Sequence, residues 1–134
     1  MTKDDVFTMA RLIAPAHNLS PHLVMAIVEQ ESDYESHARR LEQGFFWKYT
    51  RNDPTFNDVD EILLAASWGL MQMMGRSLYD VGYFFQHGGT LYDSLIRYLD
   101  DPTEQMETGC KWLAKKIALA GGDITKGLGF WNGD

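Results

Sequence analysis

Apolar residues recur with a helical period over the first part of the chain. They fall at positions i, i+3, i+4 and i+7, namely Val6, Met9, Ala10 and Ile13. This spacing places the four side chains on one face of an amphipathic helix. Thr2 precedes them as a suitable N-cap. We therefore expect the chain to begin with a helix that packs one face into a core and ends where the first proline interrupts it.

Further helices are expected wherever a capping side chain precedes the same kind of apolar period. Ser20 and Pro21 open the second helix with a cap and a proline at the first helical position, and Asp101 and Pro102 repeat the device. Gly69 is expected to break a helix in the middle of the chain. The expected helices run from Pro21 to about Glu31, from Asp58 through Ser67, from beyond Gly69 through Tyr79, from Thr90 to about Tyr98, from Asp101 to Gly121, and from Asp123 to about Trp131.

The stretch 36–54 has no clean period and contains a dense aromatic group instead: Phe45, Phe46, Trp47 and Tyr49. A small β-hairpin is expected in this region. No repeat, low-complexity tract or linker divides the chain. The pattern therefore predicts a mainly α fold of six to eight helices, in a single domain that spans residues 1–134.

Composition supports a folded domain and excludes several classes of function. The chain has 134 residues, of which 45% are hydrophobic and 23% are charged, as in globular proteins. Cys110 is the only cysteine, so an internal disulfide or a cysteine-based zinc site is excluded, and we expect no metal or other cofactor. A formal net charge of −7 disfavours nucleic acid as the main partner. The second predicted helix has no Lys or Arg, which argues against a DNA-reading helix-turn-helix.

The sequence shows no signal for export or membrane insertion. Two acids stand among the first five residues, where a secretory signal needs a basic and then an apolar run. The longest apolar run, from Leu23 to Val28, is far below the roughly 20 residues that span a bilayer. We therefore expect a protein that is made in the cytoplasm and does not insert into membranes, and we expect it to be a monomer.

One acidic residue departs from the pattern of polar residues outside and apolar residues inside. At about 100° per residue, Glu31 lies roughly 20° from Val24 and within the apolar stripe that includes Ile27 and Val28, whereas Glu29 points to the opposite side. Burial of a carboxyl group raises its pKa toward the range of a general acid at neutral pH. Glu31 is therefore the candidate catalytic residue. Two other interpretations remain open, because a side chain at a helix end can turn into water or pair with a basic residue.

Two later segments bring side chains that suit a sugar. Residues 67–72 read Ser-Trp-Gly-Leu-Met-Gln and residues 130–133 read Phe-Trp-Asn-Gly. Met71 offers an apolar wall, while Gln72 and Asn132 bring amides that can bind hydroxyl and acetamido groups. Trp131 adds a flat face for a pyranose ring. Plainer explanations also exist, since Met71 and Trp131 suit a hydrophobic core and Asn-Gly is an ordinary helix stop.

Taken in order, Glu31-Ser32, the stretch 69–72 and Trp131-Asn132 resemble the three motifs of the lytic transglycosylase superfamily. This superfamily includes the soluble lytic transglycosylases and goose-type lysozyme-like proteins, and its motifs read Glu-Ser, Gly-Leu-Met-Gln and Ala-Tyr-Asn-x-Gly. The likeness covers nearly the whole chain and is nearest to the phage-encoded branch. In the third motif Trp131 stands where tyrosine is usual, so the hydroxyl group expected near the acid is absent.

The resemblance implies a lysozyme-like fold with a substrate cleft, and cleavage of the β-1,4 bond between N-acetylmuramic acid and N-acetylglucosamine in peptidoglycan. Glu31 would protonate the glycosidic oxygen and then deprotonate the C6 hydroxyl, which leaves a 1,6-anhydro end. The partner would be peptidoglycan glycan strands, reached through phage lysis or virion delivery. The implied substrate-binding residues are Ser32, Met71, Gln72, Trp131 and Asn132. An aromatic platform can come from Tyr34, Tyr49 or Tyr98.

Two alternatives remain open. A muramidase commonly needs a second carboxylate to position water, about 6.5–9.5 Å from the acid in inverting enzymes. Glu42 is the first candidate, because Arg40-x-Glu42 ahead of Phe45-Phe46 resembles a segment of phage muramidases. Glu42 can equally be a surface charge paired with Arg39 or Arg40. A non-catalytic peptidoglycan-binding module would use the same cleft without acid chemistry.

Overall fold

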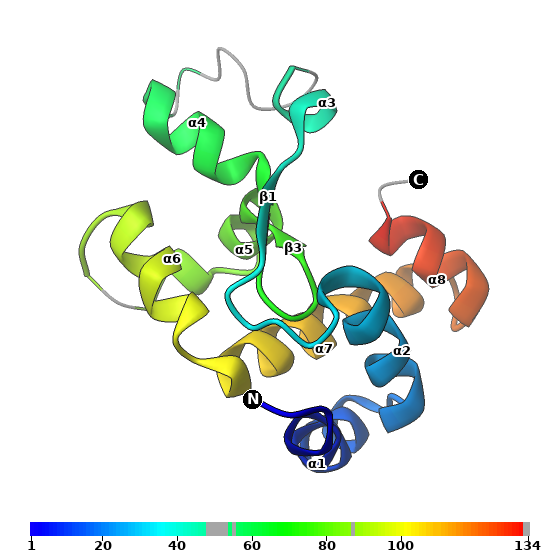
Figure 1. Cartoon of the computed structure of the whole chain (residues 1–134). Coiled ribbons are helices and arrows are strands. Elements are labelled where there is room, and N and C mark those ends of the chain that lie inside the picture. Colours follow the sequence, from blue (N-terminus) through cyan, green and yellow to red (C-terminus); the bar gives the residue numbers. More distant parts are fainter. Residues whose placement is uncertain (48–53, 55, 87, 133–134) are drawn as a thin grey trace.

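The computed structural model describes residues 1–47, 54, 56–86 and 88–132. Most of this part of the chain is helical, with a small sheet near the middle (Figure 1). The prediction of a mainly α fold with a small β element is therefore confirmed. In chain order the elements are α1 (Lys3–Ile13), η1 (Ala14–His17), α2 (Pro21–Ser32), β1 (Arg39–Leu41), α3 (Gln43–Phe45), α4 (Asp58–Leu64), β2 (Ala66–Trp68), β3 (Met73–Met74), α5 (Gly75–Asp80), η3 (Tyr83–Phe85), α6 (Leu91–Leu99), α7 (Pro102–Leu119) and α8 (Ile124–Trp131).

The N-terminal helices form where the capping residues predict them. At α1, the Asp5 N–H donates to the Thr2 hydroxyl oxygen at 3.1 Å and the Thr2 N–H donates to the Asp5 carboxylate at 2.9 Å, a reciprocal capping box. Ser20 caps α2 by accepting from the His22 N–H, and Pro21 takes the first helical position. The predicted C-terminal helices are confirmed in the same way as α6, α7 and α8.

The helix predicted over residues 58–67 begins at Asp58 as predicted, but it ends earlier. Asn57 is the cap of α4, because its side-chain oxygen accepts from the Asp60 N–H at 2.8 Å. The helix ends at Leu64, and Ser67 lies in β2. The apolar run suits a helix locally, but strand pairing on both sides of β2 decides its conformation. The next predicted helix starts late, as α5, because the short strand β3 precedes it.

Three short antiparallel strands form the sheet in the order β1-β2-β3. Arg40 of β1 lies opposite Ser67 of β2, which in turn lies opposite Met74 of β3. β2 and β3 form a hairpin, and its connection, Gly69 to Gln72, is called here the β2–β3 turn. Of the hairpin predicted within residues 36–54, β1 lies in that stretch ahead of the aromatic group, whereas its partners β2 and β3 come after it. The first aromatic residue of the group, Phe45, belongs to α3.

Two hydrophobic clusters form the core. The first cluster joins α1, α2 and α7, and the second joins α4, α5, α6, η3 and the sheet. The β2–β3 turn lies where they meet, because it contributes Leu70 and Met71 to the first cluster while its flanking strands belong to the second. The buried residues of the first cluster are Val6, Ala10, Ile13, Ala14, Leu19, Val24, Met25, Ile27, Val28, Leu70, Met71, Met106, Cys110 and Leu113. Those of the second are Leu64, Ala66, Trp68, Met73, Leu78, Tyr83, Phe84, Leu95, Tyr98 and Leu99.

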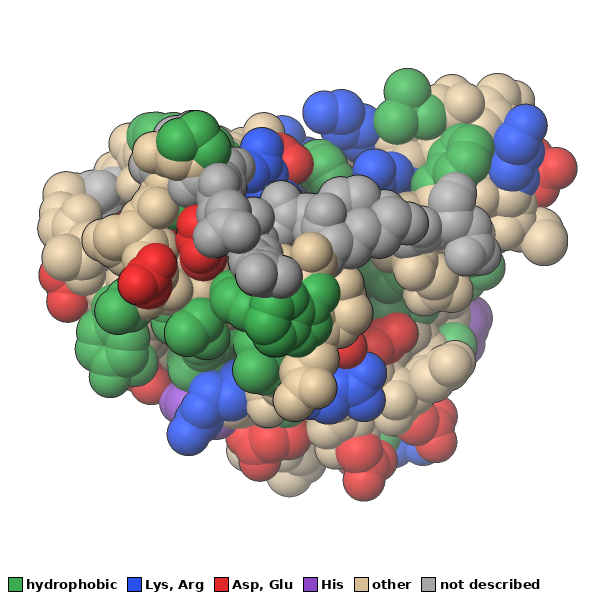
Figure 2. Space-filling view, turned by 90° about the horizontal axis from the view of Figure 1, so that it is seen from above, with side chains coloured by type: hydrophobic (Ala, Val, Ile, Leu, Met, Phe, Trp, Pro, Cys, Tyr) green, Lys and Arg blue, Asp and Glu red, His purple; other side chains and the backbone are tan. Residues whose placement is uncertain are grey.

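α3 and α4 lie at the top of Figure 1, and exposed apolar residues lie in or next to them. Trp47 is 59% exposed and Val59 is 62% exposed. Figure 2, seen from this side, shows hydrophobic side chains beside charged side chains of both signs. In the part of the chain that the structure describes, no helix combines the length and the apolar character needed to cross a membrane.

Candidate active site

Glu31 lies in the last turn of α2, in line with the stripe that packs into the first cluster. Val24 and Val28 of that stripe are buried and Glu31 is half-buried, whereas Glu29 is exposed. Burial raises the pKa of Glu31 above its ordinary value. No group of the described residues forms a hydrogen bond or an ion pair with the Glu31 carboxyl group. The fold therefore leaves a partly desolvated carboxyl group available to a ligand.

Two charged residues on the sheet side act on Glu31 electrostatically. After burial, the next influence on the pKa of Glu31 is Arg40 in β1, which lowers it, followed by Glu42 just after β1, which raises it. Both effects follow from charge, because a nearby cation favours the ionised carboxylate and a nearby anion disfavours it. The structure thus brings Glu31, Arg40 and Glu42 into one electrostatic group.

Arg40 and Glu42 form a two-point ion pair. The Arg40 Nε–H donates to Glu42 Oε1 at 3.0 Å and its Nη2–H donates to Oε2 at 3.2 Å, the fork geometry in which guanidinium and carboxylate bind strongly. Ser67, opposite Arg40 in the sheet, places its hydroxyl oxygen 3.1 Å from Glu42 Oε1. Arg39 donates instead to the His37 carbonyl oxygen at 3.2 Å. Of the two pairings open to Glu42 from the sequence, the structure shows the one with Arg40.

The Gln72 side chain is fully engaged by the protein. Its backbone has φ 50°, in the left-handed region that non-glycine residues adopt only when the surroundings enforce it. Its Nε2 donates to the Ala38 carbonyl at 3.1 Å and to the Gly69 carbonyl at 2.9 Å, and its Oε1 accepts from the Ser67 hydroxyl at 2.9 Å. The amide therefore ties the β2–β3 turn to β2 and to the segment before β1.

Ser32 and Met71 hold the same turn from the side of α2. The Ser32 hydroxyl donates to the Leu70 carbonyl at 2.7 Å, with the Val28 carbonyl also near at 3.1 Å. Met71 is fully buried in the first cluster. Its packing is so close that a Cβ added to Gly109 would overlap the Met71 sulfur. Both side chains therefore fix the turn next to the end of α2.

The remaining predicted site residues lie in different places. Trp131 is half-buried and packs against both clusters, and Asn132 is exposed where α8 ends. Tyr34 lies with Lys3 and Glu29: the Lys3 Nζ is 5.8 Å from the centre of its ring, and burial, followed by the nearby charge of Glu29, raises the pKa of its hydroxyl. Since Glu29 and Glu31 lie on opposite sides of α2, Tyr34 belongs to a surface other than that of Glu31.

Of the two other candidate tyrosines, the structure describes Tyr98 but not Tyr49. Tyr98 is fully buried in the second cluster, with its ring centre 5.2 Å from that of Tyr83. Its hydroxyl group is buried and has no hydrogen-bond partner within the described part of the chain. Tyr49 and Gly133 lie outside the described residues.

Gln105 supports the site from α7 and was not predicted from the sequence. The side chain is fully buried. Its Oε1 accepts from the Leu70 N–H at 2.7 Å, and its Nε2 donates to the carbonyls of Ser36 and Tyr98, both at 2.9 Å. It therefore binds together the β2–β3 turn, the segment after α2 and the end of α6. Its position beside Met106, at the margin of the apolar stripe of α7, is the signal that could have identified it.

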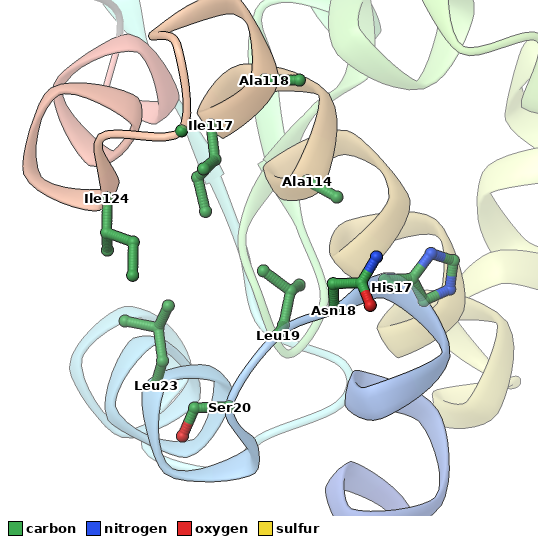
Figure 3. Close-up of a pocket in the computed structure, with 10 residues that line it drawn as sticks. His17, Asn18, Leu19, Ser20, Leu23, Ala114, Ile117, Ala118 and Ile124 are labelled. Carbon is green, nitrogen blue, oxygen red and sulfur yellow. The ribbon is translucent and has the colours of Figure 1, made fainter.

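A separate pocket of about 310 Å³ opens at the other end of α2 (Figure 3). Leu19, Leu23, Ile117 and Ile124 point toward its interior. No carboxylate is found among the residues that line it. At a rise of about 1.5 Å per residue, the eight residues from Leu23, which lines the pocket, to Glu31 span roughly 12 Å along α2. The pocket and the acid site are therefore distinct, and a substrate cleft around Glu31 stays a prediction.

The family comparison agrees with this geometry. The family model of the transglycosylase SLT domain matches residues 9–132. The chain belongs to this family of lytic transglycosylases, which act on peptidoglycan, so the resemblance to lytic transglycosylases is confirmed, while the likeness to the phage-encoded branch stays a prediction. Comparisons with curated proteins and with solved structures find no match. Among the residues that the structure describes, no three His, Cys, Asp or Glu side chains are grouped so that they could hold a metal ion.

Proposed function

We propose that this protein is a peptidoglycan lytic transglycosylase in which Glu31 alone serves as acid and base. The observation that carries the proposal is the Glu31 carboxyl group, which is half-buried, has a raised pKa, and has no hydrogen-bond or ion-pair partner among the described residues. Such a group keeps its proton closer to neutral pH and has a free oxygen with which to deliver it. Membership of the transglycosylase SLT family supports the class of reaction.

The proposed reaction needs one carboxyl group and consumes no water. Glu31 donates its proton to the glycosidic oxygen between N-acetylmuramic acid and N-acetylglucosamine, and the bond from C1 to that oxygen breaks. The Glu31 carboxylate then accepts the proton of the C6 hydroxyl while the C6 oxygen bonds to C1. The N-acetylglucosamine end leaves with a hydroxyl group, and the muramoyl end keeps a 1,6-anhydro ring. Intramolecular attack supplies the orientation that a second catalytic group would otherwise provide.

The hydrogen bonds divide the predicted substrate-binding residues into two sets. The polar groups of Gln72 and Ser32 are engaged with the protein backbone and with Ser67, so we assign both to positioning the turn beside Glu31. Asn132 is exposed and Trp131 is half-buried, so their amide and ring remain available for the glycan. In this proposal the third motif provides the direct sugar contacts.

A muramidase remains the second candidate, because Glu42 acts on Glu31 electrostatically and is thus in its neighbourhood. Hydrolysis would require Glu42 to activate a water molecule. Its carboxylate oxygens instead accept from Arg40 at 3.0 Å and 3.2 Å, which weakens it as a base. This ion pair favours the transglycosylase over the hydrolase.

The proposal is tested by digesting purified peptidoglycan with the wild-type protein, with Glu31→Gln and with the control Glu29→Gln. Glu29 is exposed on the same helix, so its variant matches the change in charge without touching the site. We expect loss of Glu31 to reduce muropeptide release by a factor on the order of 10²–10⁴, the usual contribution of a general acid. We expect Glu29→Gln to keep wild-type activity.

Mass spectrometry of the released muropeptides separates the candidate functions. Products with anhydro ends, lighter than the hydrolysis products by one water molecule, support the transglycosylase. Products with reducing ends would instead show that the protein is a muramidase. Binding of peptidoglycan by the wild-type protein and by Glu31→Gln, without release from either, would replace both with a non-catalytic binding module.

A further inference from the structure

We propose that Glu42 is a positioning residue: it holds the Arg40 guanidinium near Glu31 but out of a direct ion pair with it. Glu31 can then keep its proton before the reaction, and its carboxylate faces a cation once the proton has been donated. The inference rests on the proposed function, because it concerns Glu31 as the acid. It gives Glu42 a role other than that of the second catalytic carboxylate.

The geometry of the sheet places the side chains of Arg40, Glu42 and Ser67 on one face. Arg40 and Glu42 are two residues apart on an extended segment, so their side chains point the same way. The Glu42 N–H donates to the Ala65 carbonyl at 2.9 Å, which continues the pairing of β1 with β2 beyond Leu41. Ser67 lies opposite Arg40 in this register. The pair is thus attached to the same strand that leads into the β2–β3 turn.

Contacts on both sides keep the pair in place. The two-point contact fixes the plane of the guanidinium, since two parallel hydrogen bonds define an orientation that one cannot. The single Ser67 hydroxyl proton is within reach of both Glu42 Oε1 at 3.1 Å and Gln72 Oε1 at 2.9 Å, and the hydroxyl donates to one of them at a time. Gln72 is in turn fixed by the backbone carbonyls that it contacts. Glu42 is therefore connected through Ser67 to the turn that lies next to Glu31.

Arg40 and Glu42 are the charged groups that act on Glu31 within the described part of the chain. The β2–β3 turn contains no ionisable residue, Ser32 is neutral, and Glu29 points to the other side of α2. Arg40 influences Glu31 without forming an ion pair with it. A direct pair would hold Glu31 in its ionised form and remove its function as an acid. Glu42 prevents this because it competes for the same guanidinium.

Replacing Arg40 and replacing Glu42 should therefore shift the pKa of Glu31 in opposite directions. Replacing Glu42 by Gln removes an anion and releases Arg40 toward Glu31, and both changes lower the pKa of Glu31. Replacing Arg40 by Gln removes the cation and leaves Glu42 unpaired, and both changes raise it. The Arg40 side chain is 75% exposed, so solvent screens these effects, and we expect shifts of about half a pH unit in each direction.

The experiment measures lytic activity against pH for the wild type, Glu42→Gln, Arg40→Gln and the double variant. The alkaline limb of the profile reports the acid that must be protonated. It should move to lower pH in Glu42→Gln, to higher pH in Arg40→Gln, and lie between the two in the double variant. Arg39→Gln is the matched control, because Arg39 is the neighbouring arginine of β1 and its side chain donates a hydrogen bond to the His37 carbonyl instead of to Glu42. Its limb should not move.

A second measurement separates failure of this inference from failure of the proposed function. Carbon-13 NMR titration of the Glu31 carboxyl group, assigned by its absence in Glu31→Gln, gives the pKa without any substrate. If NMR shows that the pKa of Glu31 shifts in opposite directions in Glu42→Gln and Arg40→Gln, the positioning role of Glu42 is supported even if the wild type is inactive on peptidoglycan. Shifts in the same direction, or none, in folded Glu42→Gln and Arg40→Gln would overturn it even if the enzyme is active. If one variant does not fold by circular dichroism, the sign of the shift in the other decides.

Discussion

The two hydrophobic clusters of this small protein differ in composition and in the elements that build them. The first is aliphatic, with methionine and Cys110, and depends on the long helices α1, α2 and α7. The second contains Trp68, Tyr83, Phe84 and Tyr98 and is assembled from short helices and strands. Glu31 extends from the first cluster, whereas Arg40 and Glu42 come from the strand side. The site thus lies at the boundary of two cores that are built in different ways.

This difference separates two tasks. The first cluster fixes where the acid lies, because the apolar stripe of α2 determines the direction of Glu31. The second cluster fixes which charges lie near the acid, because the sheet packs into this cluster and β1 brings Arg40 and Glu42. The two tasks are linked by the β2–β3 turn and by Gln105, which contacts parts of both clusters.

The largest expected effect on stability comes from replacing Gln105, which links the two clusters. In Gln105→Ala, the Leu70 N–H and the carbonyls of Ser36 and Tyr98 lose a fully buried partner. We expect the free energy of unfolding to fall by about 3–5 kcal/mol, measured by urea denaturation. Gln30→Ala, at an exposed position of α2, should change it by no more than about 0.5 kcal/mol. A loss below about 1 kcal/mol in Gln105→Ala would show that the clusters are joined without this residue.

The second effect concerns the turn itself. Gly69 has φ +81°, and a Cβ there would overlap Gln105 Oε1. Gly69→Ala should therefore lower the free energy of unfolding by about 2–3 kcal/mol, part from backbone strain and part from displacement of Gln105. Gly44→Ala is the control, because a Cβ at Gly44 meets nothing within 4 Å. Equal effects of the two substitutions in denaturation experiments would contradict the close packing of the turn.

A smaller effect distinguishes two hydroxyl groups in the aromatic cluster. The Tyr83 hydroxyl donates to the Ser94 carbonyl at 3.3 Å, whereas the buried Tyr98 hydroxyl has no partner in the described part of the chain. We expect Tyr83→Phe to cost about 1 kcal/mol and Tyr98→Phe to be neutral or stabilising by up to about 1 kcal/mol. Thermal unfolding of both variants measures the difference. A larger loss from Tyr98→Phe would indicate a partner for that hydroxyl, such as a buried water molecule.

The smallest effect is the pH dependence of stability. Because burial raises the pKa of Glu31 in the folded state, folding favours the protonated form. This contribution is complete below the ordinary glutamate pKa and is lost as the pH rises through the folded-state pKa. We expect Glu31→Gln, which cannot ionise, to have a higher Tm than wild type at pH 7, with the gap closing near pH 4. A gap that is the same at both pH values would exclude ionisation of Glu31 as its cause.

The same comparison explains what could be predicted from the sequence. The helices with clear caps, such as those begun by Thr2 and Ser20, form as predicted because local signals determine them. The direction of Glu31 also follows from local periodicity. The strand at Ser67 could not be predicted in this way, because its conformation depends on Arg40, which is distant in sequence. Gln105 was missed for a related reason, since its hydrogen-bond partners come from three separate segments.

Among the described residues, β1 pairs with a strand on one side only and is therefore an edge strand of the sheet. Open edges invite pairing with another chain and hence aggregation. β1 is only three residues long and carries Arg39 and Arg40, and a short, charged edge resists such pairing. Arg40 thus protects the edge in addition to facing Glu31. Preparations of Arg40→Gln should therefore be checked for self-association at the concentrations that NMR requires.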